Sequence, residues 1–199
     1  MTTHTVAQPT MISVIWPAAQ SNRAVRVTTL AVLGSLILWA SAKIHIPFWP
    51  VPMTMQTFAV LVLGAAYGWR LGSATVILYL AEGAMGLPVF SGTPERGIGI
   101  AYMAGPTGGY LIGFVAAVAF VGWLAERGWD HSLWRMLVAM TIGHALVFLF
   151  GLAWLTGLIG LEQAVAVGLT PFWTATVLKT ALAAAVLPLA WRTLTRTGE

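Results

Sequence analysis

Two ionisable side chains lie inside apolar stretches of this sequence, and they are the first candidates for chemistry. Lys179 is the one charged residue in "TPFWTATVLKTALAAAVLPLAW" (Thr170–Trp191), and Glu82 lies in "LGSATVILYLAEGAMG" (Leu71–Gly86). A charge inside a membrane span costs about 2.5–3.5 kcal/mol on insertion scales, so it is a functional hypothesis by default. Two other interpretations stay open, because Lys179 could extend its long stem toward an interface and Glu82 could face lipid headgroups.

Motifs for enzymatic chemistry are absent from the sequence. It contains no G-x-x-x-x-G-K-[ST] phosphate loop, no H-E-x-x-H zinc motif and no G-x-S-x-G nucleophile elbow. It also contains no cysteine, which excludes disulfides, thiolate metal sites and cysteine nucleophiles. We therefore expect no enzyme, no cofactor and no metal site, and the energy for any uphill transport must come from an ion gradient or a partner.

The composition is that of an integral membrane protein. Of the 199 residues 58% are hydrophobic and 8% are charged, and the mean hydropathy is +0.84, whereas a soluble domain has about 25% charged residues. The net charge of +4 is small. Its basic residues lie at the ends of apolar segments, a pattern typical of membrane topology rather than of nucleic-acid binding.

Apolar runs of membrane-spanning length predict the elements that must position Lys179 and Glu82. A transmembrane helix needs roughly 20 mainly apolar residues. The sequence predicts an all-α membrane protein with six transmembrane helices, namely Val27–Ala42, Thr54–Tyr67, Leu71–Gly86, Gly109–Ala125, Arg135–Leu158 and Thr170–Trp191. We expect residues 1–22 to be a flexible N-terminal tail and residues 23–199 to form a single six-helix transmembrane domain.

Most basic residues lie at the segment ends of one side, which predicts the orientation. They are Arg23, Arg26, Arg70, Arg127, Arg135, Arg192 and Arg196. The positive-inside rule makes this side cytoplasmic, so both termini are expected inside the cell. The two longest links, Ala40–Met53 and Leu87–Gly108, then face outward. They are rich in proline and glycine, and irregular backbone at membrane depth persists only when it is buried or lines a cavity. We therefore expect an outer loop that caps a ligand pocket.

Three motifs carry a resemblance to a known family. They are "IPFWPVPMTMQTF" (Ile46–Phe58), "GLPVFSG" (Gly86–Gly92) and "GPTGGYLIGF" (Gly105–Phe114). In order and spacing they resemble the BioY family, the biotin-capture subunits, called S components, of energy-coupling factor transporters. The resemblance covers roughly residues 24–192. It implies a six-helix protein of the bacterial inner membrane that binds biotin from the outer side, under the link between the third and fourth segments.

The resemblance also implies roles for residues near the sixth segment. In the family this segment opens with P-F-x-P-G-D-x-x-K, whose aspartate and lysine hold the ureido head of biotin. Lys179 keeps the lysine, whereas Thr176 stands at the position of the aspartate. Threonine offers no charge to offset the lysine, so we expect Glu82 to be a substitute counter-ion. Arg96 matches the family's basic loop residue, which would bind the carboxylate of biotin, although it could also be a solvated loop charge.

Four further residues are weaker candidates. Tyr110 could stack on a ligand or belong to an interfacial aromatic belt, and Gln56 could bind the urea or make an ordinary helix–helix hydrogen bond. Ala31 and Ser35 form a small-xxx-small pair that permits close helix approach. That approach could be within the bundle, or it could dock the transmembrane coupling subunit that, in the family's transport model, connects the S component to separate ATPase subunits.

The leading hypothesis is thus a high-affinity biotin-binding subunit for import. An S component for another vitamin, of the thiamine or riboflavin class, stays open because of Thr176. A small membrane enzyme acting on a lipid is the alternative from another class, and the absence of clustered acids or histidines argues against it.

Overall fold

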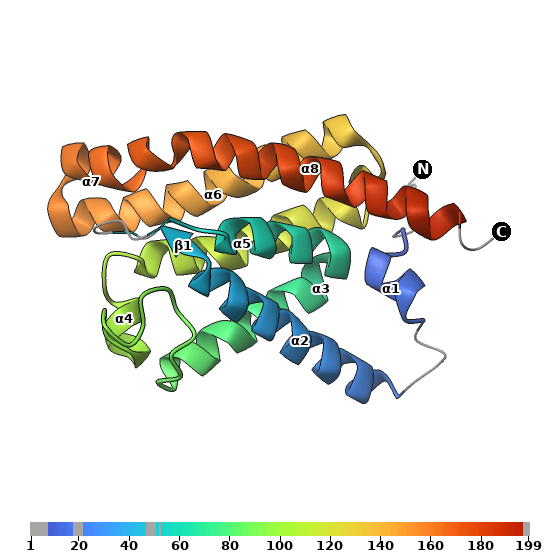
Figure 1. Ribbon diagram of the computed structural model, residues 1–199, viewed down its shortest axis with the longest axis horizontal. Coiled ribbons are helices and arrows are strands. Elements are labelled where there is room, and N and C mark those ends of the chain that lie inside the picture. Colours follow the sequence, from blue (N-terminus) through green and yellow to red (C-terminus); the bar gives the residue numbers. More distant parts are fainter. Residues whose placement is uncertain (1–7, 18–21, 47–50, 52, 197–199) are drawn as a thin grey trace, which may run out of the picture.

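Apart from one two-residue strand pair, the described residues fold into helices and their links. The computed structural model describes residues 8–17, 22–46, 51 and 53–196 (Figure 1). Strands β1 and β2 pair antiparallel, with His45 opposite Thr54. The elements in chain order are α1 (Met11–Ile15), α2 (Arg23–Lys43), β1 (His45–Ile46), β2 (Met53–Thr54), α3 (Gln56–Ala84), α4 (Gly99–Met103), α5 (Gly108–Ala125), η2 (Trp129–His131), α6 (Leu133–Ile159), α7 (Leu161–Gly168), η3 (Thr170–Phe172) and α8 (Trp173–Arg196).

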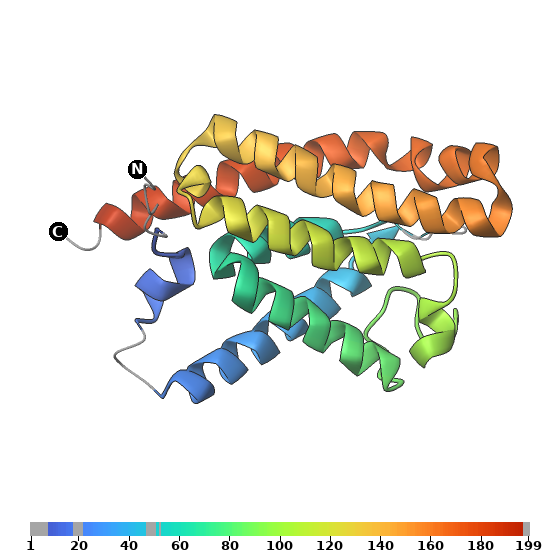
Figure 2. The same ribbon diagram turned by 180° about the vertical axis from the view of Figure 1, so that it is seen from behind.

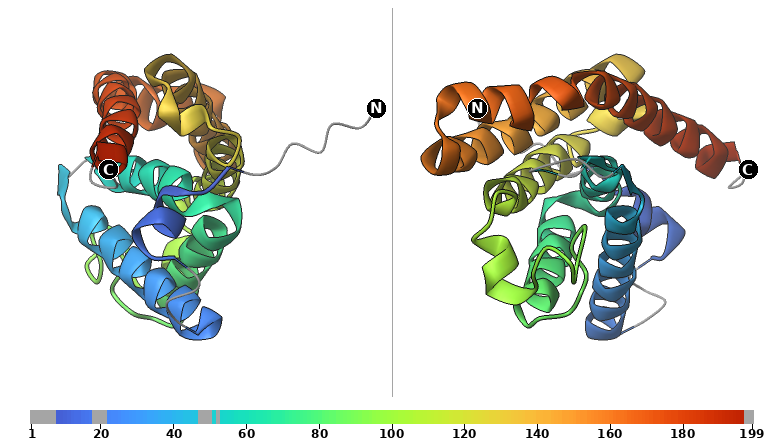
Figure 3. Two further views of the ribbon diagram at one scale, coloured as in Figure 1. Left: turned by 90° about the vertical axis from the view of Figure 1, so that its right-hand side faces the viewer. Right: turned by 60° about the vertical axis from the view of Figure 1, so that its left-hand side comes forward.

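The helices pack as one bundle around α5. Helices α6 and α8 run along one side and α2 along the opposite side, while α5 and α3 lie between them (Figures 1 and 2). The oblique view in Figure 3 shows the α6–α8 pair lying across α5 and α3. Val118 and Val121 of α5 and Val60 of α3 are fully buried, so the core lies along α5. This arrangement leaves the other faces of α2, α6 and α8 to the surroundings.

Helix α3 reverses direction at Gly68. This glycine has φ 78° and ψ 172°, a conformation that residues with a Cβ rarely adopt. A Cβ built on Gly72 would lie 3.3 Å from the Cα of Gly64, although eight residues of a straight helix rise about 12 Å. The amide of Gln56 also reaches the hydroxyl of Tyr79, 23 residues away, at 2.6 Å. The two arms of α3 therefore fold back on each other.

Five helical stretches of the described chain are long and apolar enough to cross a membrane. They are Arg23–Lys43, Gln56–Ala84, Gly108–Ala125, Leu133–Ile159 and Leu161–Leu194. The sequence predicted six. The difference arises in α3, which contains the second and third predicted segments as two helical arms separated by the non-helical Gly68.

Residues 8–17, part of the predicted flexible tail, lie against the bundle. Met11 of α1 is 7% exposed, and the N–H of Gln8 donates to the carbonyl of Glu126 at 2.8 Å. Residues 1–7 and 18–21 of the same predicted tail lie outside the described residues. Helix α1 lies near the C-terminal end of α8, at the end of the bundle opposite α4 and α7 (Figure 1). Following the orientation that the sequence predicts, we name the α1 end the inner end and the α4–α7 end the outer end, and we call residues 87–108 the outer link.

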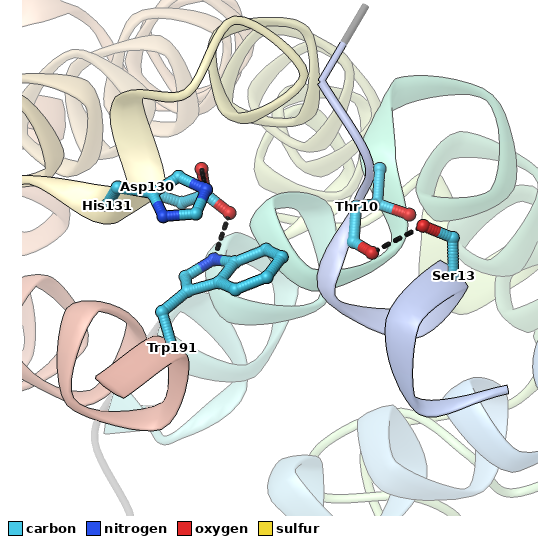
Figure 4. A network of polar contacts seen from close by, with 5 residues as sticks. All are labelled: Thr10, Ser13, Asp130, His131 and Trp191. Atoms are coloured by element: carbon cyan, nitrogen blue, oxygen red, sulfur yellow. Dashed lines mark hydrogen bonds and ion pairs between the residues drawn. The ribbon is translucent and has the colours of Figure 1, made fainter. Parts of the chain in front are cut away.

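A buried carboxylate fastens η2 to α8 at the inner end. Asp130 is 1% exposed, and its Oδ2 accepts a hydrogen bond from the indole Nε1 of Trp191 at 2.5 Å (Figure 4). The imidazole of His131 stacks on the same indole, with 4.2 Å between ring centroids. Burial raises the pKa of Asp130, whereas the Trp191 N–H and the charge of His131 act in the opposite direction.

Candidate ligand-binding site

A small cavity lies toward the outer end, where α3, α5, α6 and α8 meet beneath the outer link. Its free volume is about 60 Å³. Its polar walls come from the start of α3 and from α8, and its apolar and aromatic walls come from α5, α6 and η3. Four of the residues predicted from sequence line it, namely Gln56, Tyr110, Thr176 and Lys179. The remaining two ligand-binding candidates, Glu82 and Arg96, do not.

Lys179 projects from α8 to the start of α3. Its Nζ donates to the backbone carbonyl of Thr54 at 2.5 Å and to the hydroxyl of Thr57 at 3.4 Å. Thr54 ends strand β2 just before α3 begins. Thr176 and Lys179 are three residues apart on α8, a spacing that places both on one helix face, and both line the cavity. A charged donor thus lies among neutral oxygen atoms in a mainly apolar chamber.

Glu82 lies elsewhere and does not pair with Lys179. Its carboxylate accepts a hydrogen bond from the hydroxyl of Ser35, which ties the second arm of α3 to α2. Ser35 is 2% exposed and Ala31 is 8% exposed. A Cβ on the neighbouring Gly34 would meet the Thr75 and Tyr67 side chains of α3. The small-residue face of α2 is therefore occupied inside the bundle, which is the alternative to partner docking that the sequence left open.

Gln56 and Tyr110 line the cavity, and each already uses one polar group in a hydrogen bond inside the protein. The Gln56 amide donates to Tyr79 Oη at 2.6 Å, and Tyr79 donates to the carbonyl of Val89 in the outer link at 2.9 Å. The hydroxyl of Tyr110 donates to the carbonyl of Gly168 at 2.9 Å and so holds the end of α7. The Tyr110 ring is therefore the part of that residue available to a ligand.

Arg96 lies in the outer link beside a second hollow of about 340 Å³. Tyr102 and Thr107 line both this hollow and the cavity of Lys179, so they form the partition between them. Arg96 packs over Gly92, where a Cβ would lie 2.8 Å from its Cδ. Arg96 and Lys179 are thus on opposite sides of a thin wall rather than in one chamber.

Lys43 and Phe90 secure the outer link over the bundle, and sequence reasoning missed both. The Nζ of Lys43 donates to the carbonyl of Phe90 at 3.0 Å and to the Thr93 hydroxyl at 3.1 Å. The Phe90 ring stacks on Tyr102 at 4.8 Å and meets Tyr79 edge-on at 5.5 Å. Lys43 directly follows the first predicted segment, Val27–Ala42, and a charge at the end of an apolar segment gave no sign of this contact. Tyr79, a phenol within an apolar segment, was a signal for such a contact, because a buried hydroxyl needs a partner.

The glycines of "GPTGGYLIGF" permit close helix packing. Their φ angles are all negative, so the tolerance of positive φ that glycine offers is not used here. A Cβ on Gly113 would lie 2.8 Å from the Cα of Val147 in α6, which is closer than a side chain can approach a backbone atom without displacing it. The motif thereby brings α5 against α6 and positions Tyr110 and Phe148, whose rings meet edge-on at 6.3 Å.

Long apolar helices and a small cavity beneath the outer link define a multi-pass helical membrane protein. The chain matches the BioY family over residues 11–196, and it therefore belongs to that family.

Among its relatives is a probable biotin transporter BioY of Pyrococcus horikoshii. This chain is 34% identical to it over 155 residues, and the matched region covers 78% of this chain and 90% of the relative. It is 34% identical over 160 residues to the biotin transporter BioY of Thermotoga maritima, with 80% and 88% covered. The crystal structure of an S component for biotin from an ECF-type ABC transporter superposes with a TM-score of 0.74 at 24% identity, covering 86% of this chain and 94% of that one. At this identity the likeness shows the fold.

Proposed function

We propose that this protein captures biotin at the outer face of the cell membrane for import, as the S component of an energy-coupling factor transporter. The observation that carries the proposal is the ammonium of Lys179 in a mainly apolar cavity of a BioY-family fold. Biotin joins an apolar bicycle and chain to a urea at one end and a carboxylate at the other. An apolar chamber with few placed polar groups suits such a ligand.

In this proposal the urea lies against α8. Lys179 donates to the urea carbonyl, while the hydroxyl of Thr176, on the same helix face, can both donate and accept. The Tyr110 ring packs on the bicycle, because its hydroxyl is bound to Gly168. Gln56 contributes its amide oxygen, since its N–H is bound to Tyr79. Glu82 has no direct part in the proposed site, because it is bound to Ser35.

The tail of biotin points outward in this proposal. Its carboxylate passes the partition of Tyr102 and Thr107 and reaches Arg96, whose guanidinium suits a carboxylate in geometry and charge. The free volume of about 60 Å³ is well below the roughly 300 Å³ of sites that enclose a small ligand. Binding therefore requires the partition to move, and this would join the cavity with the 340 Å³ hollow around Arg96.

The topology and partners complete the proposal. In this proposal each arm of α3 crosses the membrane, so six crossings put both termini on the same side. The arginines at the segment ends of that side support the cytoplasm of a bacterial cell, with the protein in its inner membrane. A separate transmembrane coupling subunit and ATPase subunits supply the energy, and the chain itself is not an enzyme. Docking through Ala31 and Ser35 would require α2 to move away from α3, because both residues are buried.

Titration of biotin into the purified full-length chain tests the proposal. We expect saturable binding with a Kd below micromolar, measured by calorimetry in detergent. Thiamine and riboflavin are titrated in parallel, since they represent the other S-component classes. Tight binding of either vitamin without biotin binding would assign that vitamin as the substrate in place of biotin. Absence of biotin binding at concentrations below micromolar would overturn the proposal.

A further inference from the structure

A second apolar recess lies at the inner end, away from the cavity of Lys179. It is a shallow groove of about 460 Å³ lined by Trp69 of α3 and by Ala116, Ala119, Phe120 and Trp123 of α5. The four α5 residues recur at helical spacing, so they share one face of that helix. Trp69 and Trp123 are 39% and 42% exposed. Both indoles therefore border the surroundings of the bundle rather than its core.

Backbone packing at the bend of α3 brings the two tryptophans together. A Cβ on Gly122 would lie 2.5 Å from the backbone nitrogen of Trp69, so α5 touches the chain directly after Gly68. The Glu126 carboxylate accepts a hydrogen bond from the same nitrogen at 3.2 Å. The bend of α3 and the end of α5 are thus fixed to each other, and the groove between their indoles is a built feature of the fold.

An arginine guanidinium stacks on each indole at the groove. The Cζ of Arg127 lies 3.5 Å from the ring centroid of Trp123, and its Nη1 donates to the Trp123 carbonyl at 2.8 Å. The Cζ of Arg70 lies 5.1 Å from the ring centroid of Trp69. Neither guanidinium is in an ion pair with the carboxylates of the described chain. Stacking on an indole holds a guanidinium in place while leaving N–H groups free for another acceptor.

We propose that this groove, with Arg70 and Arg127 at its rim, binds one anionic phospholipid. One acyl chain lies along Ala116, Ala119 and Phe120, and the phosphate is bound by the two guanidiniums. The apolar trough suits an acyl chain, and the two indole-stacked arginines supply positive charge that suits a phosphate, so we take an anionic phospholipid as the occupant. Indoles are also the side chains enriched at the depth where chain and headgroup meet.

The proposal is independent of the vitamin ligand and is tested on the full chain in a neutral detergent. Native mass spectrometry counts bound lipid as phosphatidylglycerol or phosphatidylcholine of identical acyl chains is titrated. We expect one phosphatidylglycerol to bind in preference to phosphatidylcholine. Soluble glycerol phosphate, which has the anionic group without the chain, is expected not to compete at equal concentration.

Variants separate the charge from the groove. Arg70→Gln and Arg127→Gln are each expected to lower phosphatidylglycerol affinity about fivefold, since one basic residue near an anionic surface contributes about 1 kcal/mol. The matched control is Arg135→Gln, an exposed arginine at the same end but not at the groove, which should leave the affinity unchanged. Ala119→Leu keeps both charges and fills the trough, and it should lower the affinity for both lipids.

Three results would overturn the inference. Equal binding of phosphatidylglycerol and phosphatidylcholine would show that the two arginines do not select an anionic headgroup. An equal loss for Arg135→Gln and Arg127→Gln would show diffuse attraction to surface charge. Unchanged affinity in Ala119→Leu would show that no chain occupies the groove. Circular dichroism of each variant keeps these outcomes distinct from misfolding.

Discussion

Replacing Lys179 by methionine should separate binding from stability. Methionine keeps an unbranched stem of similar length and removes the ammonium, which donates to the Thr54 carbonyl and the Thr57 hydroxyl. Hydrogen bonds to a charged group contribute about 1.5–3 kcal/mol. If the urea carbonyl of biotin accepts one such bond, Lys179→Met should raise the Kd roughly 10- to 150-fold.

Stability should respond differently to the same change. The substitution loses the two bonds of the ammonium, yet it also removes a charge whose placement in a membrane span costs about 2.5–3.5 kcal/mol. The bond to Thr57 is long, at 3.4 Å, so the loss is mainly that of the Thr54 bond, about 1.5–3 kcal/mol. The loss and the gain then nearly cancel, and the melting temperature in detergent should change little. A residue that supports binding while adding little stability is typical of a functional site.

The assay is calorimetric biotin titration together with thermal unfolding of the same preparations. Arg135→Gln is a suitable control, because it removes a positive charge at an exposed position. A Kd for Lys179→Met within threefold of the parent protein would refute the role of the ammonium. A large fall in melting temperature would show instead that Lys179 is mainly a structural tie between α8 and α3.

Three further predictions concern the scaffold. Gly113→Ala places a Cβ 2.8 Å from the Val147 backbone and should destabilise the protein by about 1–3 kcal/mol. The matched control, Gly157→Ala, meets nothing within 4 Å and should stabilise the protein by about 0.5–1 kcal/mol. Thermal unfolding compares the two variants. Because burial raises the pKa of Asp130 above its ordinary value, the folded state holds this proton more tightly than the unfolded chain. Stability should therefore fall as the pH rises from about 4 through the raised pKa, and Asp130→Asn should abolish that fall in melting temperatures measured from pH 4 to 8. Lys43→Met removes the donor to Phe90 and Thr93, so hydrogen exchange of residues 87–97 should accelerate while that of α5 stays unchanged.

The sequence predicted the apolar elements well, because membrane helices can be recognised from their composition and length. Segments such as Gly109–Ala125 coincide with α5 within a residue. The sequence also identified Lys179, since a charge in an apolar segment is conspicuous, and in the structure Lys179 lines a cavity. The helix α7, Leu161–Gly168, was not predicted. Its eight residues are too few to span a membrane, so the search for apolar runs passed over it.

Contacts between segments were beyond the sequence. Glu82 was expected to be the counter-ion of Lys179, although nothing in their spacing told whether the two residues meet. Glu82 instead meets Ser35, because the reversal at Gly68 sets which face of the second α3 arm turns to α2. Helical periodicity places a residue on a face of its own helix, but it does not say which neighbour that face touches.

The partner of Lys179 shows why the missing acid was a poor guide. Sequence reasoning looked for a carboxylate to replace the aspartate at position 176, but the ammonium is bound by a backbone carbonyl, which no side-chain pattern reveals. A neutral acceptor avoids the desolvation of a second ion, which is the main cost of a buried ion pair. It also leaves the cavity with an uncompensated positive charge. Such a site favours a ligand that presents an oxygen acceptor, such as a urea carbonyl or a carboxylate, and it disfavours a cation such as thiamine, so the missing acid argues against a cationic vitamin.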